Sequence, residues 1–398
     1  MAAPYATVPK GALKQPTPFK IEVPQSQLEE LKTLLKYSRI PTPTFESLQE
    51  DQKFGISHKW ITEAKKIWLN SFDWREIEGK INSFPNFKAT VHGKDDEAFD
   101  MHFIALFSEK EDAVPILLNH GWPGSFLEFL PMLQLMKDQY TPQTLPYHLI
   151  ATSMPGYGFS TPPPQHRELG ILEVPAMFNQ LMLDLGFKDG YISHGGDIGS
   201  RFSRILAAKH EACKAIHVNY GLISQPESVP NSALNPIEQA GVLRGQIFTR
   251  EGTAYSLEHK TKPSTIGIIL SSTPLALLAW IGEKFLSWTD TDPPLDTILE
   301  SVTLYWLTEG GARSLYPYRQ TFASGMTVAE DPEFYVTKPL GHSYFAKEIV
   351  PAPRSWVENT GNLVFYRQHE HGGHFPAIEQ PVLLKGDIED FVAQVWKK

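Results

Sequence analysis

The chain has 398 residues, which is longer than one compact domain usually is, so we expect a core with an insertion or an added segment. Hydrophobic residues make up 41% and charged residues 20%, a balance that excludes a disordered protein. The net charge of -9, without any run of Lys or Arg, excludes nucleic acid as an expected partner. Cys213 is the only cysteine, which excludes an intrachain disulfide and fits a reducing compartment.

Residues 1–95 are predicted to form an N-terminal arm. Helical periodicity covers 26–37 and 56–72, and Trp60, Trp68 and Trp74 are spaced as buried anchors. The first residues lack both the basic and the long apolar region of a secretion signal, so we expect a cytoplasmic location without a membrane anchor. The arm is expected to pack either on the core of its own chain or on a second copy of the protein, so a homodimer is one of the two expected arrangements.

Residues 96–221 alternate short apolar runs with amphipathic segments. Strands are expected at 101–107, 114–119, 148–153, 190–193 and 215–219, and helices at 125–137, 174–186 and 198–209. Continuous apolar strands that alternate with helices are typical of a parallel sheet with crossover connections. The sequence therefore predicts an α/β core with a mostly parallel sheet.

Residues 222–324 interrupt this alternation and are predicted to form a helical cap. Helical patterns cover 236–252, 264–288 and 294–308 with no strand between them. The uncharged run from 265 to 282 holds several hydroxyl residues and Pro274, so we expect buried helices broken near Pro274 rather than a membrane span. The core resumes over 325–398, with strands at 340–346 and 363–366 and a helix at 388–396.

Asp197 is the candidate nucleophile. It stands in Gly195-Gly-Asp-Ile-Gly199, between a predicted strand and a predicted helix, where the G-x-S-x-G pattern of α/β-hydrolases places serine. The alternative is a glycine-rich turn with an N-cap aspartate. A serine that attacked a saturated carbon would leave an inert ether, whereas a carboxylate leaves an ester that water can cleave. The motif therefore predicts hydrolysis at a saturated carbon.

The segment His120-Gly-Trp-Pro-Gly124 lies between a predicted strand and a predicted helix. At this place an α/β-hydrolase supplies one backbone N–H of its oxyanion hole, and the residue after the nucleophile supplies the other. These donors would be Trp122 and Ile198. The alternative is a plain turn around Pro123, whose Trp-Pro bond could be cis. His120 is expected to be a structural hydrogen-bonding residue.

Three histidines in the last loop compete for the role of base. His369 and His371 have a spacing that suits a metal, but no third ligand stands at a recognisable distance, so no metal is expected. His374 follows Gly372 and Gly373, a flexible link that can bring it to the carboxyl edge of the sheet. We therefore favour His374 over His371.

The acid that orients the histidine must lie between nucleophile and base in the chain. Glu348 stands at the end of a predicted strand and is our candidate, whereas Asp331 and Glu333 are expected to be solvated. Such an acid holds the imidazole in the right tautomer and stabilises the imidazolium.

Several motifs together resemble the microsomal-type epoxide hydrolases, most closely their soluble fungal members: His120–Phe126, Gly195–Ser200, Arg250–Tyr255, Thr261–Gly267 and Gly372–Phe375. The resemblance runs from about Pro18 to the C-terminus. It implies an α/β-hydrolase fold, a small-molecule epoxide and water as partners, and a vicinal diol as product. It implies no metal or organic cofactor.

The resemblance also implies two cap tyrosines that bond the epoxide oxygen and supply its proton. They fall on Tyr255 and Tyr318, with Tyr305 and Tyr316 as alternatives to Tyr318. Two other functions stay open: a haloalkane dehalogenase, which shares the aspartate nucleophile but needs no proton donor, and a non-catalytic binding protein on the same fold. Apolar cap residues favour an aryl or alkyl substituent on the substrate, among them Leu275, Leu277, Trp280 and Trp306.

Overall fold

The computed structural model describes residues 3–51, 53–321 and 327–397, so the predicted boundary at 324/325 lies outside the described residues. The described strands are β1 (Thr17–Pro18), β2 (Asn86–His92), β3 (Ala98–Leu106), β4 (Val114–Asn119), β5 (Tyr147–Thr152), β6 (Tyr191–Gly195), β7 (Cys213–Val218), β8 (Val336–Phe345) and β9 (Gly361–His369). They form one sheet in the order β1-β2-β3-β5-β4-β6-β7-β8-β9. Strands β4 to β9 pair in parallel, and β1 to β3 extend one edge in antiparallel fashion. The predicted α/β core is confirmed.

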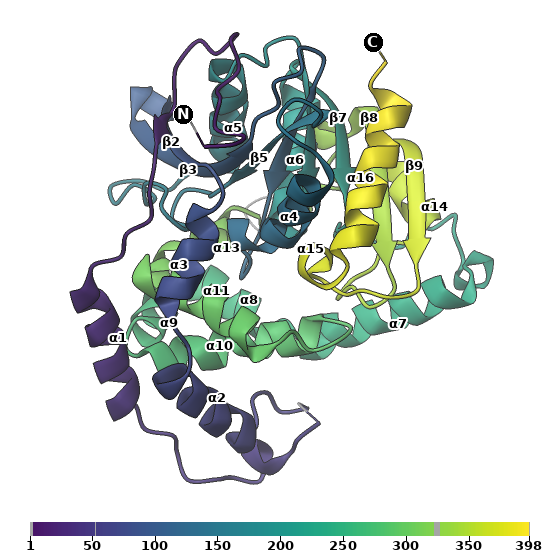
Figure 1. Ribbon diagram of the computed structural model, residues 1–398. Coiled ribbons are helices and arrows are strands. Elements are labelled where there is room, and N and C mark those ends of the chain that lie inside the picture. The colour runs from purple at the N-terminus through teal and green to yellow at the C-terminus, as the bar shows by residue number, and fades with distance from the viewer. Residues whose placement is uncertain (1–2, 52, 322–326, 398) are drawn as a thin grey trace.

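Helices cover both faces of this sheet because its central strands are apolar on both sides. Every residue of β4 and β5 is buried. Helices α4 (Leu130–Gln139) and α16 (Pro381–Val395) pack into one hydrophobic cluster, and α5 (Glu173–Asp184) and α6 (Asp197–Lys209) pack into the other. Figure 1 shows these helices on either side of the strands, with the short helices α14 (Arg354–Val357) and α15 (Pro376–Glu379) near the C-terminal part.

A separate helical layer lies across one end of the sheet (Figure 1). Residues 222–321, which the structure describes without a gap, hold no strand. Their helices are α7 (Pro236–Glu251), α8 (Ala254–Thr261), α9 (Pro263–Leu270), α10 (Pro274–Trp288), α11 (Leu295–Leu307), α12 (Gly310–Arg313) and α13 (Tyr316–Thr321). The Tyr305 hydroxyl donates to the Gly124 carbonyl oxygen, and the Tyr157 hydroxyl donates to the Ser314 carbonyl oxygen, each over 2.8 Å. These bonds hold the layer against the carboxyl ends of the core strands.

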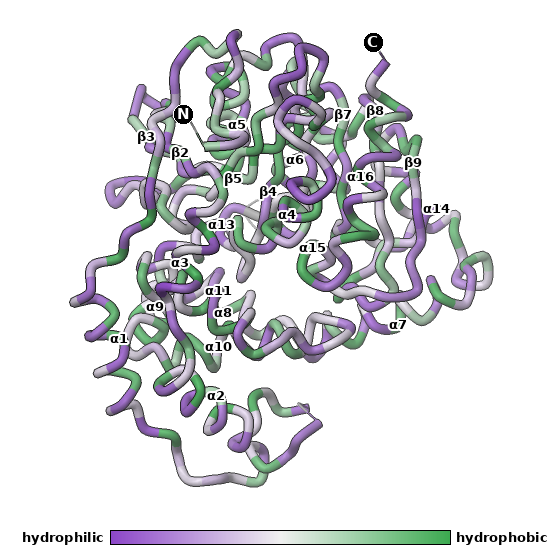
Figure 2. Tube along the Cα trace, in the orientation of Figure 1, coloured by the Kyte–Doolittle hydropathy of each residue, from purple (hydrophilic) through white to green (hydrophobic). Residues whose placement is uncertain are grey.

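The apolar run around Pro274 forms two helices, as predicted. Helices α9 and α10 meet at an angle of 113°, and the Thr273 hydroxyl caps α10 by accepting from the Ala276 N–H. Figure 2 shows hydrophobic residues along α10 and along the sheet strands. Most of α10 is buried within the protein. Across the described ranges, no single helix is both long enough and apolar enough to cross a membrane.

The N-terminal arm packs on the cap through α1 (Gln25–Tyr37), α2 (His58–Asn70) and α3 (Trp74–Asn82). Trp60 of α2 lies against α10 so closely that a Cβ added at Gly282 would come within 2.8 Å of its ring. The Lys80 ammonium of α3 pairs with the Glu300 carboxylate of α11 at 3.1 Å. Trp68 and Trp74 are buried as expected, whereas Trp60 is half-buried.

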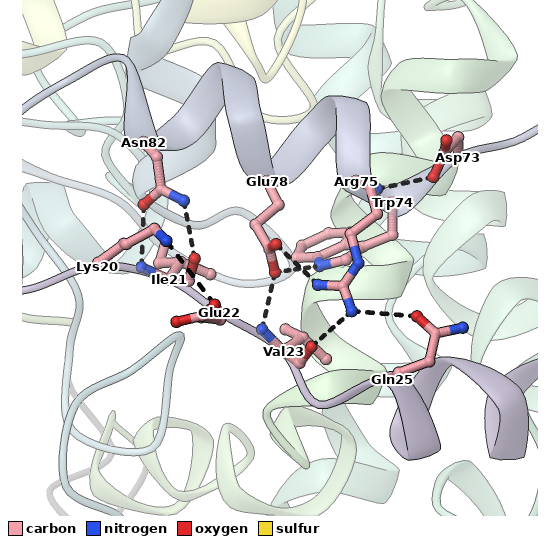
Figure 3. A network of polar contacts seen from close by, with 10 residues as sticks. All are labelled: Lys20, Ile21, Glu22, Val23, Gln25, Asp73, Trp74, Arg75, Glu78 and Asn82. Atoms are coloured by element: carbon pink, nitrogen blue, oxygen red, sulfur yellow. Dashed lines mark hydrogen bonds and ion pairs between the residues drawn. The ribbon is translucent and has the colours of Figure 1, made fainter.

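Glu78 fastens the extended start of the arm to α3 (Figure 3). Its carboxylate accepts from the Val23 backbone N–H at 2.8 Å, from the Trp74 indole N–H at 3.3 Å and from the Arg75 guanidinium at 2.8 Å. Arg75 donates in turn to the Val23 carbonyl oxygen at 2.8 Å. One buried carboxylate thus connects a chain segment without secondary structure to a helix that touches the cap.

Several elements differ from the sequence prediction, among them helices α3 and α8, which were not expected. Strand β2 was not expected; it pairs along its whole length with β3 and extends the sheet. Helix α16 begins at Pro381 rather than at residue 388, because proline fits the first turn of a helix, where its missing N–H breaks no hydrogen bond.

Candidate active site

The turn from β6 to α6 presents Asp197. Its φ of 44° lies in the left-handed region, which is strained for a residue with a Cβ. The turn is also crowded: a Cβ at Gly199 would lie 2.1 Å from the Asn119 carbonyl oxygen, so only glycine fits there. The carboxylate is thereby held at the first residue of a helix, where the helix dipole favours a negative charge.

His374 lies between two carboxylates. Its Nδ1 is 2.6 Å from Glu348 Oε1, and its Nε2 is 3.2 Å from Asp197 Oδ2. The Glu348 carboxylate also accepts from the Ile349 N–H at 2.6 Å. The backbone N–H of His374 donates to the Trp288 carbonyl oxygen of α10 at 2.8 Å, which fixes the loop. The imidazole is fully buried, so water reaches it only from within the site.

The carboxylates of Glu348 and Asp197 determine the charge of His374. Burial alone would lower the pKa of His374, but Glu348 and Asp197 raise it to about 10. Burial would raise the pKa of Asp197, but contact with His374 and the Ile198 backbone N–H bring it below its usual value. At neutral pH the pair is therefore an imidazolium beside an aspartate anion.

A backbone donor faces the candidate nucleophile from the loop after β4. The Trp122 N–H donates to Asp197 Oδ1 over 2.8 Å, whereas His374 contacts Oδ2. The Trp122–Pro123 peptide bond is cis. His120 is buried beside this loop, its Nδ1 3.0 Å from the Gly121 carbonyl oxygen, and burial lowers its pKa to about 4. His120 therefore stays neutral in a structural position.

Tyr255 of α8 and Tyr318 of α13 lie together over Trp122. The Tyr255 ring stacks on the Trp122 indole with centroids 5.3 Å apart, and the two tyrosine rings meet edge to face at 5.8 Å. Burial and the charge of Asp197 raise the pKa of both phenols, so both keep their protons. Of the alternatives, Tyr305 uses its hydroxyl to hold Gly124, and the Tyr316 hydroxyl has no hydrogen-bond partner among the described residues.

The other histidines and acids considered for the base and its orienting acid have partners away from Asp197. His371 is exposed and 3.7 Å from Asp290, and His369 pairs with buried Asp387 at 2.6 Å. Asp331 caps the turn of residues 332–334, and Glu333 forms an ion pair with a lysine on the surface. In the part of the chain that the structure describes, no group of three or more His, Cys, Asp or Glu side chains could hold a metal ion.

Sequence reasoning missed several groups at the site, among them His259, Glu128 and Asn219. His259 lies one helical turn after Tyr255, and its ring is 4.6 Å from Trp122 and 4.8 Å from Tyr318. Burial and then nearby Lys284 lower the pKa of His259 to about 3. Glu128 lies close enough to Asp197 for the two charges to interact. Two sequence features could have indicated His259 and Glu128. His259 stands four residues after Tyr255, so both lie on the same face of a helix, and Glu128 is the single acid in Phe126-Leu-Glu-Phe129.

A cavity of about 740 Å³ opens beside Tyr255. Tyr255 and Trp288 form its wall toward Trp122 and His374, with ring centroids 5.3 and 5.0 Å from them. Phe54 of the N-terminal arm and Trp280 also line it. Of the other apolar cap residues expected near the substrate, Leu277 and Trp306 line a second cavity of about 350 Å³.

Comparison with known proteins identifies the family of this chain. The family described as "Epoxide hydrolase N terminus" matches residues 16–129, and that described as "alpha/beta hydrolase fold" matches residues 114–247. Epoxide hydrolase 1 of Sus scrofa is 30% identical over 94% of this chain and 88% of its own. The structure of Aspergillus niger epoxide hydrolase is 49% identical, with a TM-score of 0.94 over 99% of this chain and 100% of that one. The juvenile hormone epoxide hydrolase of Bombyx mori is 27% identical, with a TM-score of 0.83 over 96% and 95%. The chain therefore belongs to the epoxide hydrolases of the α/β-hydrolase fold.

Proposed function

We propose that this epoxide hydrolase opens its substrate through a covalent ester on Asp197. The observation that carries the proposal is that one carboxylate contacts His374 through Oδ2 at 3.2 Å and the Trp122 N–H through Oδ1 at 2.8 Å. Tyr255 and Tyr318 bond the epoxide oxygen and one of them donates its proton as the ring opens. The cap, residues 222–324, acts as the lid that carries both phenols.

The charge of His374 changes during the cycle. Ester formation removes the negative charge of Asp197, and this removes one of the two causes that raise the pKa of His374. The imidazolium then returns a proton to the tyrosinate and becomes a neutral base. Glu348 keeps it oriented through Nδ1.

Hydrolysis restores the starting charges. Water attacks Cγ of the ester as His374 accepts a proton, and the N–H groups of Trp122 and Ile198 hold the oxyanion. The leaving diol oxygen takes that proton as the ester bond breaks. The remaining carboxyl proton returns to His374, so the net reaction is epoxide plus water to vicinal diol.

A single turnover in heavy-oxygen water tests the covalent step. The nucleophilic oxygen of the first diol comes from Asp197, so the label is expected in the Asp197 carboxylate and not in that diol. Label in the first diol would mean direct attack by water and would overturn the ester.

The His374→Gln variant gives a second test. It lacks the base for hydrolysis, so intact-protein mass spectrometry is expected to show an adduct with the mass of one substrate. Peptide mapping is expected to place that adduct on Asp197.

A further inference from the structure

A small cavity lies on the core side of Asp197. Its volume is about 10 Å³, which is room for roughly one water molecule. The lining residues all come from the core and include five polar side chains: Glu128, His194, Asp197, Asn219 and His374. The cavity is therefore small and in contact with both the nucleophile and the base.

Two of these side chains have unused hydrogen-bonding groups. Asn219 is buried at the end of β7, and its Nδ2 has no hydrogen-bond partner within the described ranges. His374 Nε2 faces Asp197 at 3.2 Å but is not aligned for a hydrogen bond with any described residue. Leaving buried polar groups unpaired is unfavourable, so the site favours a polar occupant.

Glu128 reaches this cavity because residue 124 has no side chain. A Cβ at Gly124 would lie 2.1 Å from Glu128 Oε2, so the carboxyl occupies the space beside the loop that carries Trp122. Burial and then the charge of Asp197 raise the pKa of Glu128 well above its usual value, which keeps it protonated. A neutral carboxyl can both donate and accept a hydrogen bond.

We propose that this cavity binds the water that hydrolyses the ester, and that Glu128 and Asn219 position it. The proposal rests on the two-step mechanism proposed above. The water donates one hydrogen to Nε2 of neutral His374 and the other to the carbonyl oxygen of Glu128. It accepts from Asn219 Nδ2, and its remaining lone pair attacks Cγ of Asp197. The new O–Cγ bond forms as the proton passes to His374, and the Cγ–O bond to the substrate then breaks.

The proposal separates two rate constants that rapid-mixing kinetics measure: formation of the ester and its breakdown. Glu128→Leu removes the polar group at similar size, so breakdown is expected to slow by about 10-fold or more, while formation stays within about 3-fold. Both kcat and KM are expected to fall, so kcat/KM is nearly unchanged. Glu128→Gln keeps a neutral donor and acceptor and is expected to restore breakdown to within about 3-fold of the wild-type rate.

Two further variants guard against a general loss of structure. Asn219→Leu acts on the same water from the loop after β7 and is expected to slow breakdown selectively. Glu300→Leu is the matched control, because Glu300 is also a buried glutamate but pairs with Lys80 at the arm. Both rate constants are expected to stay at the wild-type value in that variant.

The outcomes distinguish the two proposals. If Glu128→Leu breaks down the ester at the wild-type rate, or slows both steps equally, Glu128 does not position the water. If Glu128→Gln is as slow as Glu128→Leu, a charged carboxylate is needed and the neutral role is wrong. If His374→Gln accumulates no adduct, the covalent mechanism itself fails.

Discussion

A single methyl group at Gly121 tests how tightly the nucleophile is held. The Cβ of alanine at this position would lie 2.0 Å from Asp197 Oδ1, 2.4 Å from its Cβ and 2.6 Å from its Cγ. Nonbonded carbon atoms pack at about 3.5–4.0 Å, so one side must move by about 1 Å or more. Asp197 has little freedom to do so, since it is the strained first residue of α6 and contacts Trp122 and His374.

Gly121→Ala is therefore expected to lose activity more than stability. A displacement of about 1 Å at a reacting group lowers the rate by roughly 100-fold, and overpacking a well-filled site destabilises by about 1–3 kcal/mol. The assay measures kcat/KM for diol formation from styrene oxide, together with urea denaturation of the same preparation.

Gly386→Ala is the matched control for this experiment. Gly386 lies within α16, where an added Cβ meets nothing within 4 Å. Activity is expected to stay unchanged and stability to rise by up to about 1 kcal/mol, because alanine is the better helix former. A folded Gly121→Ala enzyme with kcat/KM within about 10-fold of wild type would refute the tight placement of Asp197.

Three other predictions concern the acids, the base and the arm. Tyr255→Phe and Tyr318→Phe are each expected to slow ester formation by about 10-fold or more, and the double variant is expected to slow it far more than either. A double variant with the wild-type rate would mean that these tyrosines are not the proton donors. In NMR titration, His374 is expected to titrate near its pKa of about 10 and at lower pH in Asp197→Asn; equal pKa values would contradict the charge coupling. Because this pKa lies above the unfolded value of about 6.5, the stabilisation that protonated His374 contributes is complete below that pH and is lost as pH rises toward 10. Glu78→Ala is expected to lower the free energy of unfolding by about 3 kcal/mol, since buried donors lose their acceptor; a change below about 1 kcal/mol in urea denaturation would contradict that role.

The alternation of apolar strands and helices was enough to predict the α/β core and the positions of Trp122, Asp197, Glu348 and His374 at strand ends. Side chains that follow parallel strands meet at the carboxyl edge of the sheet, so their proximity follows from topology. The break between two helices at Pro274 was predictable because proline interrupts the interior of a helix.

Other features depend on contacts that one sequence does not display. From the sequence, Glu128 could equally lie on a solvated helix face. Its carboxyl reaches the site only because it passes close to Gly124, which has no side chain. His259 becomes an active-site residue only because α8 and α13 pack together. Strand β2 has a half-polar sequence, and its pairing with β3 is a tertiary contact that outweighs weak local preference.

The bond from the His374 N–H to the Trp288 carbonyl oxygen has a mechanical consequence. It joins the loop of the base to the last residue of a lid helix, and the Gly372 N–H adds a second link to Asp290 at 3.0 Å. A lid that swung away as a rigid body would pull the histidine off its partners. We therefore expect substrate to enter through the cavity that Tyr255 lines, while the lid stays seated and the base keeps its alignment between turnovers.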